Sequence, residues 1–178
     1  EVQDGKHPVI IYAPSYQASS AENFILCEYL ASQGYLVLAT PSRGITQLRM
    51  GKGTTAEAEA QLYDLNFLIG HASTLPNADL DQIYTIGFSF GGFPSVLLAM
   101  NNRYVDGVIS LDGTPQYHPE VLKASKFYEK DGLRVPFVHF TQKEIPDIVI
   151  QEDKIDPDFG KPFVFFDSLR QAPAYQFQ

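Results

Sequence analysis

Short apolar runs alternate with longer amphipathic stretches along nearly the whole chain. The runs are continuous, as is typical of strands that are buried on both faces of a parallel sheet. They occupy residues 9–13, 35–40, 83–87, 105–111 and 135–141. The stretches between them space their apolar positions three and four residues apart, which indicates helices. The expected helices cover residues 19–34, 54–69, 92–100 and 119–128.

Two local signals predict where the first two helices begin. Ser19-x-x-Glu22 and Thr54-x-x-Glu57 both have the capping-box pattern, in which the Glu side chain accepts a hydrogen bond from the backbone of the capping residue. Gly34 then supplies a stop for the first helix. The apolar face of that helix is expected to contain Ile25, Leu26, Tyr29 and Leu30.

Strands that alternate with helices predict parallel pairing through right-handed crossovers. The chain is therefore expected to form one domain over residues 1–178, a three-layer α/β/α sandwich with a mostly parallel sheet of about six strands. Residues 163–170 are ambiguous between helix and strand, whereas 174–178 resemble the start of a further strand. In such sheets the functional residues lie on loops just past the carboxyl ends of strands.

Composition narrows the class of protein. The chain has 178 residues, of which 44% are hydrophobic and 19% charged, as in an ordinary globular domain. With 13 Lys and Arg against 21 Asp and Glu, its formal net charge of −8 disfavours a nucleic-acid or anionic-membrane surface. The single Cys27 cannot form an internal disulfide, and no targeting segment or membrane span is visible. This composition suits a cytoplasmic and an exported protein equally, and it sets no oligomeric state.

One loop carries a pattern that points to chemistry. Gly87-Phe88-Ser89-Phe90-Gly91 is a G-x-S-x-G sequence between an apolar strand and a helix, which is the setting of a nucleophile elbow. The sharp turn holds the serine in a strained conformation, and side chains at the two flanking glycines would collide. Gly92 is expected to let the following helix approach the sheet closely. The alternative is a glycine-rich turn with an incidental serine.

With this elbow, the sequence resembles the α/β-hydrolase superfamily, and within it the dienelactone-hydrolase-like and platelet-activating-factor-acetylhydrolase-like serine esterases. The resemblance extends over nearly the whole chain, and the elbow in its setting is its specific part. The matching segments are residues 8–12, 31–37, 87–92 and 108–113.

The resemblance implies an oxyanion hole made by two backbone amides. One belongs to Phe90, directly after the nucleophile, and the other to Tyr16 in the loop after the first strand. These esterases usually have His-Gly at the loop entry, where this chain has Pro14-Ser15, so the donor could lie one residue away. An ordinary surface turn at Pro14-Ser15 is the alternative.

The resemblance also implies a carboxylate that orients a histidine. In the acetylhydrolase-like esterases the acid follows the strand that ends at Leu111, which makes Asp112 the expected acid. In many other α/β-hydrolases it follows the next strand, and the candidates there are Glu144 and Asp147. Asp112-Gly113 could also be a turn pair with no catalytic role.

A serine nucleophile needs a base, which in this superfamily is a histidine after the last strand. His7 and His71 precede Ser89 and are expected to be surface residues. His118 is expected to open a helix at Pro119, and His139, inside a strand, to be a core or sheet-edge residue. We therefore expect the catalytic histidine beyond Gln178. This chain would then be an inactive excerpt of a hydrolase core that begins inside its sheet.

These observations favour a serine hydrolase that cleaves a small carboxylic ester with an apolar portion. The alternatives are a peptidase or thioesterase of the same fold, or a non-catalytic binding protein. No cofactor or metal is expected, because the His and Cys residues lack ligand spacing and Gly51-Lys52-Gly53 does not fit a phosphate loop. Arg43 could meet a substrate anion or be a solvated loop charge. Aromatic residues expected near the site are Tyr16, Phe88, Phe90, Phe93 and Tyr117.

Overall fold

The computed structural model describes residues 5–43, 54–116, 118–142 and 174–177. Its strands form one six-stranded sheet in the order β2-β1-β3-β4-β5-β6, and each neighbouring pair of these strands is parallel. The strands are β1 (His7–Ala13), β2 (Leu36–Ala39), β3 (Ala78–Phe88), β4 (Val105–Leu111), β5 (Phe137–Gln142) and β6 (Ala174–Phe177). The mostly parallel sheet expected from the sequence is confirmed.

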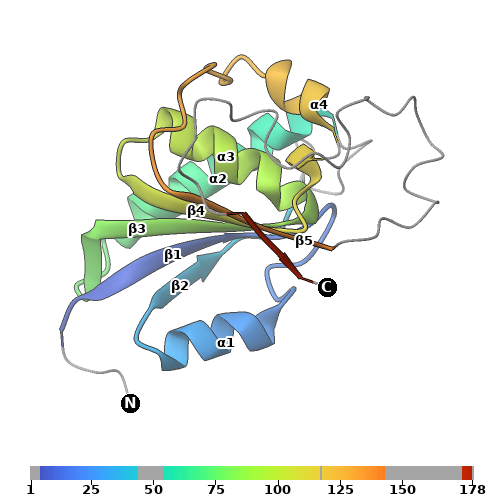
Figure 1. The fold of residues 1–178 in the computed structure, drawn as a ribbon. Helices are drawn as coiled ribbons and strands as arrows, with labels where there is room; N and C mark the ends of the chain where they lie inside the picture. Colours follow the sequence, from blue (N-terminus) through green and yellow to red (C-terminus); the bar gives the residue numbers. More distant parts are fainter. Residues whose placement is uncertain (1–4, 44–53, 117, 143–173, 178) are drawn as a thin grey trace.

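Helices cover both faces of this sheet (Figure 1). Helix α1 (Phe24–Ser32) lies on one face, and the other three described helices lie on the opposite face. They are α2 (Thr55–Ala72), α3 (Gly92–Asn101) and α4 (Pro119–Lys123). The result is the three-layer α/β/α arrangement.

The strand order changes direction at β1. The chain passes from β1 outward to β2, then returns to pair β3 with the other side of β1, and continues from there to β6. Ligands of open α/β sheets bind beside the carboxyl ends of the strands at such a switch point. The loops after β1 and β3 are therefore the place to look for a site.

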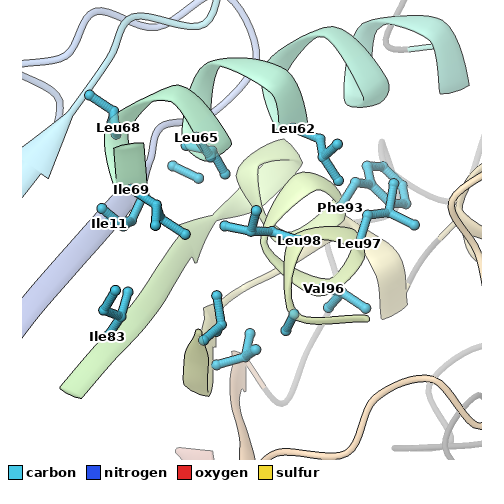
Figure 2. Packing of buried hydrophobic residues seen from close by; sticks show 14 of the residues in the cluster. Ile11, Leu62, Leu65, Leu68, Ile69, Ile83, Phe93, Val96, Leu97 and Leu98 are labelled. Atoms are coloured by element: carbon cyan, nitrogen blue, oxygen red, sulfur yellow. The ribbon is translucent and has the colours of Figure 1, made fainter. Parts of the chain in front are cut away.

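The larger core lies between the sheet and the layer of α2 and α3. Figure 2 shows Leu62 and Leu65 of α2 and Leu97 of α3 packed with strand residues such as Ile11 and Ile83. A smaller cluster on the α1 face is centred on Ile10, Tyr12 and Ile86. Because β1 and β3 are covered on both faces, their apolar runs are continuous rather than alternating.

The capping box at the start of α2 is confirmed, whereas the one predicted for α1 is wrong. Glu57 Oε2 accepts a hydrogen bond from the Thr54 amide over 2.8 Å. By contrast, the Glu22 carboxylate turns to Ser15 instead of the Ser19 amide, and α1 begins only at Phe24. Asn23 precedes it with a φ of 56° and donates to the Tyr12 hydroxyl, so a tertiary contact sets this helix start.

The expected apolar face of α1 is wrong in part. Ile25 and Tyr29 are 71% and 61% exposed, whereas Cys27 and Leu30 pack against the smaller core cluster. Helix α4 is also shorter than predicted, ending at Lys123, and residues 163–170 lie outside the described part. Among the described helices, none combines the length and apolar character needed to cross a membrane.

Candidate functional site

Ser89 stands at the sharp turn from β3 into α3. It follows Phe88, the last residue of β3, and opens a short 3-10 turn over Ser89–Gly91 that leads directly into α3. Its φ is 50°, in the left-handed region that costs a residue with a Cβ roughly 1–2 kcal/mol. Ser89 therefore has the strained geometry that the elbow pattern predicts, and its side chain is only half-buried.

The two glycines of the pattern are required by close backbone contacts. A Cβ added to Gly87 would lie 2.6 Å from the Gly91 carbonyl carbon and 2.7 Å from Ser95 Oγ. One added to Gly91 would lie 2.7 Å from the Ala13 carbonyl carbon and 2.8 Å from the Pro14 oxygen. The elbow is thus packed directly against the carboxyl end of β1.

Gly92 has a different role from the one expected. A Cβ at this position would lie 2.9 Å from Pro115 Cδ and 3.2 Å from Gly113 Cα, both in the loop after β4. The absence of a side chain at Gly92 therefore allows the loop after β4 to pack closely against the start of α3. It does not serve to bring the helix closer to the sheet. As a consequence, the segment that follows Asp112 touches the elbow.

Asp112 begins the loop after β4, beside the elbow. Phe88 and Leu111 are paired residues of β3 and β4, so Ser89 and Asp112 take the next position on each strand. Asp112 also has a positive φ, 46°, and its amide donates to the carbonyl of Phe140 in β5 over 2.7 Å. Its side chain is half-buried.

His139 is a buried sheet residue, as expected. Its ring is 5% exposed and stacks on Phe137 at a centroid distance of 6.1 Å. Burial lowers the pKa of His139 to about 4, and the Asp112 carboxylate, which favours the charged ring, offsets only part of this effect. His139 lies on β5, two strands from Ser89, or roughly 10 Å at the spacing of a sheet.

The other histidines occupy three different settings. His118 precedes Pro119 at the start of α4, as predicted, with Nδ1 3.1 Å from Glu120. His71 is exposed on α2, where its ring stacks on Phe67. The expectation of a surface residue is wrong for His7, which is half-buried and donates from Nδ1 to the Gly34 carbonyl over 2.9 Å.

The loop after β1 is held by a carboxylate that sequence reasoning placed elsewhere. Glu22 accepts hydrogen bonds from the Ser15 amide at 2.6 Å and from Ser15 Oγ at 2.5 Å. The Tyr16 ring packs edge-on against Phe90 with centroids 5.7 Å apart. The Ser15 amide donates to Glu22, and Tyr16 is the next residue of this loop.

A buried glutamine links the loops after β1 and β2. Gln61 of α2 is 1% exposed; its Nε2 donates to the Pro14 carbonyl over 3.1 Å, and its Oε1 accepts from Ser42 Oγ over 3.2 Å. Sequence reasoning missed this residue. The available signal was a polar side chain beside Leu62 within the apolar pattern of α2, since buried polar groups are usually hydrogen-bonded.

The remaining candidates divide between core, surface and positions outside the described residues. Phe90 and Phe93 are 4% and 1% exposed and belong to the larger core cluster, whereas Arg43 is exposed. Within the described residues, no three His, Cys, Asp or Glu side chains form a group that could hold a metal ion. The positions outside them are Tyr117, Glu144, Asp147 and residues 51–53.

The sequence is similar to a known protein family and to a curated protein. The sequence pattern of the dienelactone hydrolase family matches residues 1–131. A Synechocystis protein named "Putative carboxymethylenebutenolidase" is 32% identical over 104 residues, which cover 50% of this chain and 42% of that protein. The chain therefore spans less than half the length of this curated relative.

Two solved structures have the same fold at low sequence identity. A dienelactone hydrolase-like promiscuous phosphotriesterase from metagenomic libraries has a TM-score of 0.66 and 16% identity. The match covers 99% of this chain and 72% of the phosphotriesterase chain. A dienelactone hydrolase from Anabaena variabilis has a TM-score of 0.63 and 16% identity. The match covers 98% of this chain and 74% of the Anabaena chain. The architecture is thus that of the α/β-hydrolases.

Proposed function

Because the chain belongs to the dienelactone hydrolase family, we propose that it forms the catalytic core of a serine hydrolase that cleaves carboxylic esters. The observation that carries the proposal is the geometry of Ser89. It combines a φ of 50°, two sterically required glycines and a position at the switch point of the sheet. Strained residues that their surroundings hold in place cluster at functional sites.

In the proposed reaction, Ser89 Oγ attacks the ester carbonyl carbon while its proton passes to an imidazole base. The Phe90 and Tyr16 amides hold the oxygen anion that forms, and fixed donors of this kind contribute several kcal/mol to such steps. The base then protonates the departing alcohol, which leaves an acyl-enzyme for water to hydrolyse.

Asp112 is the proposed acid that orients this base. It occupies the position next to Ser89 at the same edge of the sheet, and the loop after it touches α3 at Gly92. His139 is an unsuitable base because it lies two strands from Ser89 and is buried against Phe137. We therefore keep the expectation that the base lies beyond Gln178.

The substrate is proposed to be a small ester with an apolar portion. The half-buried Tyr16 ring packs edge-on against the buried Phe90 ring, and it is proposed to offer an apolar surface next to the oxyanion amides. The Synechocystis relative is named for a butenolide, and the bond cleaved in a lactone is a carboxylic ester. The elbow identifies the nucleophile but does not determine which leaving group the substrate carries. Peptidase or thioesterase activity is therefore the second candidate.

A fluorophosphonate probe tests the proposal on the full-length protein. The probe should attach covalently to Ser89, as shown by mass spectrometry of the labelled peptide, and Ser89→Ala should abolish labelling. Ser73→Ala is a matched control, because Ser73 is an exposed serine at the end of α2. Labelling that survives in Ser89→Ala would exclude Ser89 as nucleophile, and a folded full-length protein that is never labelled would favour a binding function.

A further inference from the structure

Glu22 makes both of its described hydrogen bonds to one residue seven positions earlier in the chain. Its Oε2 accepts from the Ser15 amide at 2.6 Å, and its Oε1 accepts from Ser15 Oγ at 2.5 Å. Both residues are half-buried. Hydrogen bonds to an ionised carboxylate are shorter and roughly twice as strong as those between neutral groups. The pair therefore fixes the backbone of Ser15, the residue directly before the proposed oxyanion donor.

The turn that follows gives Tyr16 a defined place. The Ala18 amide donates to the Ser15 carbonyl over 3.1 Å, and Gln17 has a φ of 58°, as the third residue of a type II turn requires. Tyr16 is the second residue of this turn.

The other side of the loop is held from the core and from the loop after β2. Gln61 donates to the Pro14 carbonyl, and the Ser42 amide donates to the Ala18 carbonyl over 3.0 Å. The elbow also packs against Ala13 and Pro14 through Gly91. Between Pro14 and Ala18, the backbone of Ser15 is held by the contact with Glu22, and the Tyr16 ring packs against Phe90.

We propose that Glu22 is a positioning residue for the oxyanion hole. Its carboxylate occupies the Ser15 amide and holds the turn so that the next amide, that of Tyr16, is directed at the elbow beside Phe90. This inference rests on the proposed function, because it assigns the role of Glu22 within that same site. Glu22 acts through Ser15 and has no contact with substrate in this role.

The geometry separates a positioning role from a role of the negative charge. A glutamine at position 22 can keep both contacts, since its amide oxygen accepts from the Ser15 amide and its NH2 group donates to Ser15 Oγ. Alanine keeps neither of them. A positioning residue should therefore be rescued by glutamine, whereas a residue that acts by its charge should not.

The test compares Glu22→Ala, Glu22→Gln and Ser15→Ala with the unchanged full-length protein, using p-nitrophenyl butyrate as substrate. Glu22→Ala should lower kcat by roughly 10- to 100-fold, approaching the loss of one oxyanion donor. The change in KM should stay below about threefold, because the oxyanion exists only in the transition state. Glu22→Gln should recover most of kcat, and Ser15→Ala, which keeps the amide contact, should fall between them.

Two further measurements keep the inference falsifiable. Glu28→Ala is the matched control, because Glu28 is exposed on α1, the helix that follows Glu22, and it should leave kcat unchanged. Hydrogen exchange of the 14–18 segment should accelerate in Glu22→Ala while β1 stays protected, which also verifies that the variant is folded. The inference is overturned if kcat is unchanged in folded Glu22→Ala, if glutamine is as harmful as alanine, or if exchange of this segment is unaffected. If the unsubstituted full-length protein shows neither esterase activity nor probe labelling, the proposed function itself is overturned.

Discussion

Ser89 and Asp112 occupy equivalent positions on neighbouring strands, one residue past the paired Phe88 and Leu111, and both have a positive φ, 50° and 46°. Two left-handed residues side by side at one edge of a sheet are costly, since each loses about 1 kcal/mol or more relative to a relaxed conformation. The contacts at Gly91, Gly92 and the Phe140 carbonyl hold them there. This pairing motivates the first two predictions.

Asp112→Asn should lower kcat by about ten-thousandfold if Asp112 orients the base, because an amide favours the wrong tautomer of the imidazole. KM should change little. Steady-state kinetics of the full-length protein measures both constants. Asp81→Asn is the control, since Asp81 is exposed near the start of β3. Full activity in Asp112→Asn together with a loss of activity in Glu144→Gln or Asp147→Asn would assign the role of the acid to a residue after β5.

Ser89→Gly should be more stable than Ser89→Ala by about 1 kcal/mol, because glycine accepts a positive φ and alanine does not. Both variants lack the hydroxyl, so the comparison isolates backbone strain. Urea unfolding of the two proteins measures the difference. At Ser73, where φ is −64°, the alanine variant should instead be more stable than the glycine variant. Equal stability of the two Ser89 variants would argue against strain at the elbow.

Gly91→Ala should destabilise the protein by several kcal/mol or prevent folding, since the new Cβ would meet the Ala13 and Pro14 carbonyls. Gly70→Ala should instead stabilise it by about 0.5–1 kcal/mol, because Gly70 lies within α2 with open space at its Cβ position. Thermal unfolding of the two variants gives the comparison. A tolerated Gly91→Ala would contradict the close contact between the elbow and β1.

Stability should fall as pH decreases from about 6.5 towards 4, because burial lowers the pKa of His139 to about 4. In this window the unfolded chain binds a proton that the folded protein excludes, so folding becomes less favourable by roughly 3 kcal/mol at pH 4. His139→Phe should remove that part of the pH dependence in urea unfolding at a series of pH values. Val108→Ala truncates a core side chain. It should lower the free energy of unfolding by about the same amount at every pH and leave its dependence on pH unchanged.

The architecture could be predicted because it depends on patterns that are local in sequence. Continuous apolar runs located five strands, and the alternation with helices predicted their parallel pairing. The elbow was also predictable, because its two glycines and serine fall within five residues of one another. Gly91 in particular is required by a contact with Ala13, yet the short pattern identifies it without knowledge of that partner.

Features that depend on distant contacts could not be predicted in this way. The Ser19-x-x-Glu22 pattern fails because Ser15, earlier in the chain, offers Glu22 two donors. The exposed Ile25 shows that an apolar spacing identifies a helix without saying which of its residues meet the sheet. Gln61 carries no local sign of its two partners, which lie on different loops.

The contact of Gly91 with the end of β1 also has a kinetic consequence. Tyr12 and Ile86 are paired neighbours although 74 positions separate them, so the elbow reaches its final shape only after a large loop of chain has closed. Contacts between segments so far apart form slowly compared with helices. Recovery of probe labelling at Ser89 during refolding should therefore lag behind the return of helical signal, which makes the nucleophile a reporter of the docking of β1 onto β3.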